Sequence, residues 1–456
     1  MTANMASVTL VYPYFQPEND NSIFRFPPLG LGYLAAYLKE HNVSVDLVDC
    51  TFMDKNRALE RIKRSDPKII GIQSLYSMKN SAVEFALLLR EHCELLVAGG
   101  PQPTSNPKDF LRSFDVVVRG EGEETMLELV NEVEGNLDLS NVKGIAYKQN
   151  DRIRLTPKRE FIENLDTIPF PTRDLFDNRG YKNYYSKNYG YTTTSMITSR
   201  GCPFECDFCS QPIFGNRFRS RSAANIVEEM QTVVELGYER IWFADDCFTL
   251  DRKRILEICE EIIRRRVEIG WECLSRVDTV EKKVVEKMRQ ARCIRIFFGI
   301  ESGNNSILRA MRKNTTTEKA KEAVEVAKKV KIQAGAFFIV GYPGETSATV
   351  LDTVNFASSL PLDYLSFTMP YPIPGTPLYE KVKDRLMVQE WEEPKNLRLV
   401  KHKLLFKSSL SEAKLKMAIV KGMIQFYLRK YLRSKGYGLI GRPFELVTDF
   451  LYRRLH

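Results

Sequence analysis

The chain has 456 residues, of which 43% are hydrophobic and 27% charged, and 67 Lys and Arg against 58 Asp and Glu give a formal charge of +9. This composition excludes a disordered or fibrous chain, and the length suffices for two or three domains with cores of their own. The longest apolar run, residues 336–340, is far shorter than the ~18 residues that a membrane-spanning helix needs. The first basic residue is Arg25, so we expect no secretory leader, no transmembrane segment and a cytoplasmic location.

Short β-branched runs alternate with amphipathic segments over the first part of the chain. Strands are predicted at residues 8–12, 45–48, 68–73, 95–98 and 116–119. Helices are predicted at residues 31–40, 59–65, 81–91 and 123–134. This alternation is typical of a doubly wound parallel sheet, which binds ligands beyond the carboxyl ends of its strands. We therefore expect a Rossmann-like α/β domain over residues 1–140.

The alternation stops at residues 141–185, where a hairpin pattern at 144–154 precedes a segment with three prolines, and we interpret this stretch as a linker. It resumes over residues 186–375, with strands predicted at 194–198, 240–243, 272–274, 295–299, 333–340 and 364–369. Six βα units are too few to close an eight-stranded barrel, so we expect an open, partial (β/α)6 barrel with its function at the strand carboxyl ends. Residues 376–456 form a basic helical region, with a helix predicted at 412–432.

The positive charge is concentrated at the end of the chain. Residues 401–456 contain 13 Lys and Arg against 3 Asp and Glu. The simplest interpretation is a solvated helix face whose apolar residues, in a stretch such as 427–433, pack inward. The alternative is a contact with an acidic protein, a lipid headgroup or a nucleic acid, of which the nucleic acid is not the expected partner.

Nine cysteines, an odd number, argue against a disulfide framework. Three of them, Cys202, Cys206 and Cys209, form a C-x3-C-x2-C loop directly after the first barrel strand. Soft thiolates favour zinc or an iron–sulfur cluster. A structural zinc site normally has four ligands, and no further C-x2-C pair or neighbouring histidine supplies the fourth. Three thiolates on a four-iron cluster leave one iron open, so the spacing favours such a cluster.

This loop, at this place in a partial barrel, resembles the signature of the radical S-adenosylmethionine (SAM) superfamily. The resemblance implies that Cys202, Cys206 and Cys209 hold a four-iron four-sulfur cluster. In that family the open iron binds the amino and carboxylate groups of SAM, and reduction releases a 5′-deoxyadenosyl radical. Phe208 matches the position that lies beside the adenine.

Other strand ends are similar to the SAM-binding segments of the same family. Glu301 and Ser302, in Gly-Ile-Glu-Ser-Gly after the fourth strand, match the ribose-binding segment. Gly341 opens a Gly-Tyr-Pro-Gly-Glu turn similar to the one on the adenine side. Arg276 lies where the family often places a polar residue near the methionine carboxylate, and an ordinary ion pair with Asp278 is the equal alternative.

Two adjacent carboxylates, Asp245 and Asp246, end the second barrel strand. They either position a substrate or cap the next helix, and we favour the cap for at least one of them.

A doubly wound domain before a radical barrel is the arrangement of the cobalamin-binding radical SAM enzymes, the class B type methylases. The resemblance covers nearly the whole chain, with matching segments at residues 26–34, 99–101, 120–123 and 168–174. The D-x-H-x-x-G motif that supplies a histidine ligand to cobalt is absent, so we expect no histidine on the lower face. The predicted cobalamin-binding residues follow three strands of the first domain: Ser74, Leu75, Tyr76, Gly99, Gly100, Gly120 and Glu121.

The resemblance implies a cobalamin-dependent C-methyltransferase, in which a substrate radical takes a methyl group from methylcobalamin. Two alternatives stay open. One is a non-methylating cobalamin radical enzyme, such as an oxidative cyclase or a rearrangement catalyst, and the other is a cobalamin sensor or carrier without catalysis. A reductant such as flavodoxin or ferredoxin is implied. The substrate, whether peptide or protein, lipid or tetrapyrrole-like molecule, is not indicated by the residues.

Overall fold

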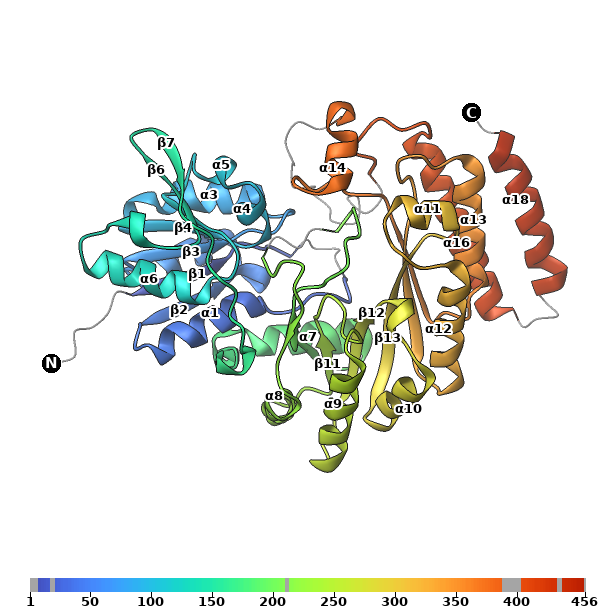
Figure 1. Cartoon of the computed structure of the whole chain (residues 1–456), viewed down its shortest axis with the longest axis horizontal. Helices are drawn as coiled ribbons and strands as arrows, with labels where there is room; N and C mark the ends of the chain where they lie inside the picture. The colour runs from blue at the N-terminus through green and yellow to red at the C-terminus, as the bar shows by residue number, and fades with distance from the viewer. Residues whose placement is uncertain (1–6, 17–20, 210–212, 388–402, 433–436, 455–456) are drawn as a thin grey trace.

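The computed structural model describes residues 7–16, 21–209, 213–387, 403–432 and 437–454. Two main β-sheets form the body of the protein, one in the first third of the chain and one in its middle (Figure 1). Within the described residues, no helix is both long and apolar enough to span a membrane.

The first sheet has seven strands in the order β2-β1-β3-β4-β5-β6-β7, and the first five strands of the chain run parallel. These strands are β1 Val8–Tyr12, β2 Val45–Asp49, β3 Ile69–Gln73, β4 Leu95–Gly99 and β5 Val116–Val118. Helices α1 Leu29–Glu40 and α6 Glu123–Glu134 cover one face, and α2 Lys55–Arg64 and α3 Lys79–Leu89 cover the other. Successive side chains such as Leu10 and Val11 therefore enter opposite cores, which explains the continuous apolar runs.

The hairpin that we placed in a linker is part of this sheet, so the boundary expected at residue 140 is wrong. Strand β6, Ile145–Gln149, pairs antiparallel with β5, and β7, Arg152–Leu155, pairs antiparallel with β6. Ile145 and Ala146 are fully buried. The apolar edge of β5 needs a covering strand, and the hairpin supplies it.

The second sheet has six parallel strands in the order β15-β14-β13-β12-β11-β8, an open partial barrel as expected. Its strands differ by at most two residues at either end from the predicted ones: β8 Thr193–Met196, β11 Arg240–Phe243, β12 Gly270–Ser275, β13 Cys293–Glu301, β14 Gln333–Ile339 and β15 Tyr364–Thr368. The helices between them are α8 Ala223–Glu235, α9 Arg252–Arg264, α10 Lys282–Gln290, α11 Asn305–Ala310, α12 Thr317–Lys329 and α13 Ser347–Ser359. Between β8 and α8, the short strands β9 Ser199–Arg200 and β10 Arg219–Ser220 bracket the cysteine loop.

A segment of the first domain fills part of the barrel interior with aromatic rings. The Phe24 ring lies 5.2 Å from that of Trp242 and 5.5 Å from that of Phe297. Phe26 also stacks on Trp242, with 6.2 Å between the ring centroids. These contacts connect the two domains through an apolar core.

The remaining described helices are α4 Pro101–Ser105, α5 Pro107–Phe110, α7 Asn178–Tyr189, α14 Pro377–Val382, α16 Glu412–Tyr431 and α18 Arg442–Arg454. Helix α16 matches the helix predicted at 412–432 and packs on α13. The expectation that apolar residues of the stretch 427–433 pack inward is wrong for Tyr427 and Tyr431, which are exposed and stack on each other. Residue 433 lies outside the described part.

Candidate active site

The cysteine loop is held in place from its centre, at Asp207. The Asp207 amide donates to the Met311 carbonyl at 3.1 Å, and its buried carboxylate accepts from the hydroxyl of Tyr342 and from Lys381 Nζ at 2.5 Å. Gly201 begins the loop with φ +82°, and a side chain there would lie 2.3 Å from the Arg217 carbonyl oxygen. The chain therefore turns sharply before Cys202 and is anchored between the cysteines, which leaves their thiols for another partner.

The three thiols lie close enough to influence one another. Desolvation raises the pKa of Cys209 to about 12, and the Asp246 carboxylate and the thiols of Cys206 and Cys202 add to the shift. Desolvation also raises the pKa of Cys202. Among the described residues, no three His, Cys, Asp or Glu side chains are placed to hold a single metal ion. A four-iron cluster binds its thiolates through different irons, so its cysteines lie farther apart than the ligands of a single metal ion. The positive charge of the irons would stabilise the thiolates. The donor set fits an iron–sulfur cluster.

Arg276, which follows β12, borders the cysteine loop. Its guanidinium makes a two-point pair with Asp278, at 2.9 and 2.7 Å, so the ion pair that we gave as an alternative is confirmed. The same group lies 3.5 Å from Cys206 Sγ and 3.6 Å from the centre of the Phe204 ring. Asp278 therefore holds the Arg276 guanidinium against the cysteine loop.

The side chains of Glu301 and Ser302, at the end of β13, have partners in different parts of the structure. Glu301 has φ +72°, at an irregularity in the pairing of β13 with β14, and its carboxylate accepts from Lys313 Nζ at 3.0 Å. Lys313 Nζ also lies 5.8 Å from the centre of the Phe208 ring. A left-handed backbone at a non-glycine residue costs free energy and is often found at functional sites. The structure thus brings Glu301 and Phe208 together through Lys313, a residue that the sequence patterns did not reveal.

Ser302 does not join this group. Its side chain is fully buried, and its hydroxyl lies 3.0 Å from that of Thr353 on α13. It also accepts from the Asn304 amide at 3.1 Å. The ribose contact of Ser302 stays a prediction, and in this structure its hydroxyl forms the turn before α11.

The C-terminal region fills the space beside Gly341. Its φ is +91°, and a side chain there would lie 2.5 Å from Leu415 Cδ1 of α16. The buried carboxylate of Glu345 closes the turn by accepting from the amides of Gly341 at 2.6 Å and Tyr342 at 2.8 Å. Gly341 therefore packs against α16 and its adenine contact stays a prediction, and the Tyr342 hydroxyl connects the turn to the cysteine loop.

Burial of Glu345 predicts a pH-dependent stability. Desolvation raises the pKa of this carboxyl from its ordinary 4.5 to about 7. The folded state binds the proton more tightly than the unfolded state, so stability is lost as the pH rises from about 4.5 to about 7. The loss amounts to about 3 kcal/mol. The neutral Glu345→Gln variant is expected to lose this dependence, measured by urea unfolding at pH values below and above this window. Glu60→Gln, at an exposed position on α2, is the control and should leave the dependence unchanged.

Neither Asp245 nor Asp246 caps a helix, contrary to our expectation. Helix α9 begins after Asp251, whose side chain accepts from the Arg254 amide at 3.1 Å. The buried Asp245 accepts from the Thr198 amide and from Ser199 Oγ, both at 2.6 Å. It fixes the chain just before the cysteine loop. Desolvation, followed by the neighbouring Asp245, raises the pKa of Asp246 to about 6.

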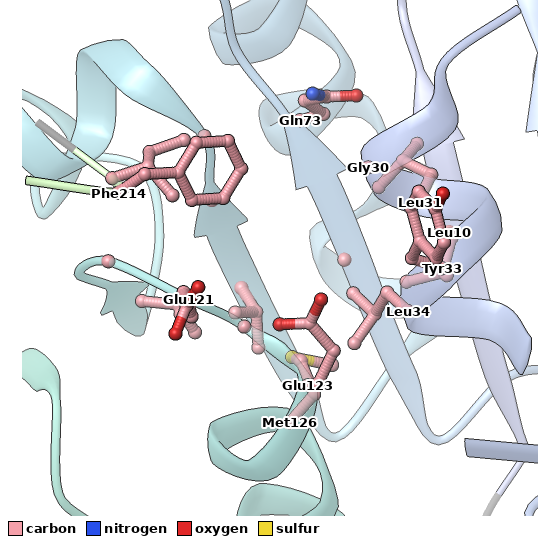
Figure 2. A pocket seen from close by; sticks show the side chains of 18 of the residues that line it. Leu10, Gly30, Leu31, Tyr33, Leu34, Gln73, Glu121, Glu123, Met126 and Phe214 are labelled. Carbon is pink, nitrogen blue, oxygen red and sulfur yellow. The ribbon is translucent and has the colours of Figure 1, made fainter. Parts of the chain in front are cut away.

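The first domain has a cavity of about 120 Å³ at the carboxyl edge of its sheet (Figure 2). Side chains of α1 line one side, and on the other side lie Glu121, Glu123 and Phe214. Four residues predicted to bind cobalamin line it: Gly99, Gly100, Gly120 and Glu121. Gly100 and Gly120 have φ +104° and +92°, and no atom lies within 4 Å of where a Gly99 side chain would begin. The glycines leave space beside apolar walls for one part of the organic frame of cobalamin, since the cavity is much smaller than the whole cofactor.

Three other predicted cobalamin contacts do not line this cavity. Ser74 is fully buried and donates to Gln102 Oε1 at 3.2 Å, and the Tyr76 hydroxyl lies 2.7 Å from that of Ser105. Both side chains therefore hold α4 against the loop after β3. Leu75 lines a separate cavity of about 720 Å³ between the first domain and the barrel.

Glu121 and Glu123 also join the two domains through buried ion pairs. Glu121 pairs with Arg200 at 2.9 Å and with Arg219 at 3.0 Å, and Glu123 pairs with Arg200 at 2.5 Å. All four side chains are at most 7% exposed. The carboxylate that we assigned to cofactor binding is therefore engaged by two arginines from beside the cysteine loop, and Glu121 contributes to the cavity only as part of its wall.

A third cavity, of about 440 Å³, adjoins the cysteine loop. Cys209 lines it together with Arg119 and Arg159 of the first domain. Gly120 and Ile213 line both this cavity and the one beside α1. The candidate sites for the cluster and for cobalamin therefore meet.

Comparison with known proteins agrees with this geometry. The model of the radical SAM superfamily matches residues 196–357, and that of the B12 binding domain matches residues 20–130. An uncharacterized methyltransferase of Pyrococcus horikoshii is 37% identical over 416 residues, which cover 88% of each chain. The chain belongs to the cobalamin-binding radical SAM enzymes. The expected family is confirmed, and the cofactors of such an enzyme are a four-iron four-sulfur cluster, SAM and cobalamin.

Two further relatives show how far this family extends. The anaerobic magnesium-protoporphyrin IX monomethyl ester cyclase of Cereibacter sphaeroides is 28% identical over 442 residues, covering 93% of this chain and 71% of the cyclase. The solved structure of the radical enzyme OxsB, with aqua-cobalamin and SAM bound, matches with a TM-score of 0.78 at 21% identity, over 98% of this chain and 72% of OxsB. The likeness to OxsB confirms the fold of the present chain. The assignment of Cys202, Cys206 and Cys209 as cluster ligands stays a prediction.

Proposed function

We propose that the protein is a cobalamin-dependent radical SAM C-methyltransferase that methylates an unactivated carbon. The observation that carries the proposal is the meeting of two cavities at Gly120 and Ile213, one in the cobalamin-binding domain and one containing Cys209. A transfer that uses both cofactors needs both beside one substrate. The relative at 37% identity, described as a methyltransferase, supports the same reaction.

When bound, the cluster and SAM supply a 5′-deoxyadenosyl radical, and cobalamin supplies the methyl group. The chain's own residues hold and orient these groups. Cys202, Cys206 and Cys209 provide the thiolates, and Arg276 steadies Cys206 from 3.5 Å. Lys313 holds the Glu301 carboxylate in place at 3.0 Å. We further propose that a one-electron donor such as flavodoxin or ferredoxin reduces the enzyme. The proposed substrate is a peptide or protein, a lipid or a tetrapyrrole-like molecule.

The products of SAM test the proposal. The anaerobically reconstituted protein, given cobalamin, SAM, a reductant and a mixture of candidate substrates, is expected to form both 5′-deoxyadenosine and S-adenosylhomocysteine. The methylated substrate should gain one methylene unit by mass spectrometry. Formation of neither product from SAM would overturn the proposal.

A second candidate, an oxidative cyclase, is favoured by the 28% identity to the cyclase of Cereibacter sphaeroides. Such a reaction forms 5′-deoxyadenosine without S-adenosylhomocysteine. The ratio of the two products therefore separates the two functions.

Glu301 and Ser302 provide a test of the SAM site by matched substitutions. Glu301→Gln is expected to weaken SAM binding by about tenfold or more, since it removes a charged hydrogen-bonding group beside Lys313. Ser302→Ala should leave SAM binding unchanged, because this hydroxyl faces Thr353. Equilibrium binding of SAM to the reconstituted protein measures both effects. Equal affinities of the two variants would contradict the assignment of Glu301.

A further inference from the structure

Helix α18 has its apolar and polar faces reversed with respect to an ordinary surface helix. Four large apolar side chains point away from the protein and are 53–66% exposed: Leu446, Val447, Phe450 and Leu451. The face toward the protein carries Glu445, Thr448 and Asp449. A helix on a globular protein normally buries its apolar face.

Polar contacts explain why the helix is held this way. Asp449 pairs with Lys421 of α16 at 2.6 Å and accepts from Asn355 of α13 at 2.9 Å. Glu445 pairs with Arg429 of α16 at 3.0 Å. Tyr452, only 3% exposed, lies beneath Lys414. The inward face of α18 is thus occupied by specific partners, and its apolar face is left for something outside the described residues.

The charges around the apolar face indicate what covers it. Both acidic residues of α18, Glu445 and Asp449, are paired on the inward side. The charged residues on the exposed side are Arg442, Arg453 and Arg454, and the guanidinium of Arg454 lies 4.3 Å from the centre of the Phe450 ring. This combination of bulky apolar side chains with arginines at the rim is that of helices lying at the surface of an anionic bilayer. A second copy would bring the same arginines against one another, which electrostatic repulsion disfavours.

Exposed apolar side chains are also concentrated in the chain just before α18. Of the 19 large apolar side chains that are exposed in the described residues, 11 lie between Met417 and Leu451. On α16, the exposed ones are spaced three or four residues apart: Met417, Val420, Ile424, Tyr427 and Tyr431. Figure 1 shows α18 at the end of the molecule farthest from the first domain. A surface bound there would leave the interface between the domains uncovered.

We propose that α18 docks the protein onto a membrane surface rich in anionic lipid, with Leu446, Val447, Phe450 and Leu451 at the headgroup boundary. The full-length protein should float with phosphatidylcholine vesicles that contain phosphatidylglycerol. Three arginines near the surface are expected to make this binding about a hundredfold tighter than to phosphatidylcholine alone. Raising the salt concentration should weaken it.

Matched substitutions test the helix itself. L446E/F450E should weaken vesicle binding by about tenfold or more, since it places two carboxylates at the apolar boundary. L87E is the control, because Leu87 on α3 is 66% exposed, as Leu446 is, and this variant should bind as the unaltered protein does. Unfolding curves check that both variants are folded.

Three results would overturn the proposal. One is equal binding to vesicles with and without phosphatidylglycerol. Another is unchanged binding of L446E/F450E. The third is a dimer, seen by sedimentation in the absence of vesicles, that L446E/F450E dissociates while vesicle binding is not observed. The last result would assign the face to a second copy of the chain.

Discussion

Replacing Cys206 with Ala is expected to abolish the iron–sulfur cluster and to reduce SAM cleavage to background. The remaining two cysteines of the loop cannot hold a cluster that needs three thiolates. Arg276 would also lose the sulfur at 3.5 Å. Iron and sulfide content, paramagnetic resonance of the reduced protein and the yield of 5′-deoxyadenosine measure the effect.

The control for this substitution is Cys93→Ala, in the first domain and outside the cysteine loop, which should keep the cluster and the activity. Cobalamin binding should survive in both variants, because the cavity beside α1 contains no cysteine of the loop. A Cys206→Ala protein that retains its iron and cleaves SAM would refute the cluster assignment. If the unaltered protein binds cobalamin but never cleaves SAM, a sensor or carrier is the better description.

Replacing Glu121 with Gln is expected to lower the free energy of unfolding by about 3–5 kcal/mol, since it leaves the buried Arg219 without its counter-charge. Glu121 lies between Arg200 and Arg219, and its side chain is 3% exposed. Arg219 already has two guanidinium nitrogens without a hydrogen-bond partner, so it has little to compensate the loss. Urea unfolding, followed by circular dichroism, measures the change.

An exposed ion pair provides the comparison for Glu121. Glu163 pairs with Arg217 at 2.6 Å, but these side chains are 60% and 65% exposed. Water screens such a pair, and Glu163→Gln should cost less than about 1 kcal/mol. Similar losses in the two variants would show that the pairs between the domains contribute no more than a surface contact does. A larger loss for Glu121→Gln would show that the segment 120–123 serves to dock the barrel as well as to line the cobalamin cavity.

Local patterns predicted most of the fold correctly because the responsible interactions are short in range. The β-branched runs that became β1 to β5 and the six barrel strands follow from backbone preference and from burial on both faces. The linker prediction failed at the hairpin of β6 and β7. A hairpin pattern shows that two strands pair with each other, but not that β5, some 25 residues earlier in the chain, has an edge for them to cover.

Local sequence patterns likewise predicted one part of the candidate site and missed another. The spacing of Cys202, Cys206 and Cys209 confines three thiols to one loop whatever the rest of the fold does. Gly100 and Gly120 mark turns with a positive φ that glycine adopts most easily. The side-chain pairings of Glu121 and Ser302 were not predicted, because nothing near them in the chain reveals Arg200, Arg219 or Thr353 as their partners.

The amino-acid sequence by itself determined the two α/β units, the cysteine loop and the family to which they belong, since each depends on neighbours a few residues apart. Only the tertiary structure decided which buried charges pair when the two residues lie far apart in the chain. It placed Lys313 between Glu301 and Phe208, joined Glu121 to the barrel, and turned the acidic face of α18 inward. A buried charge must find an opposite charge in space, and the chain can supply that partner from any distance along its length.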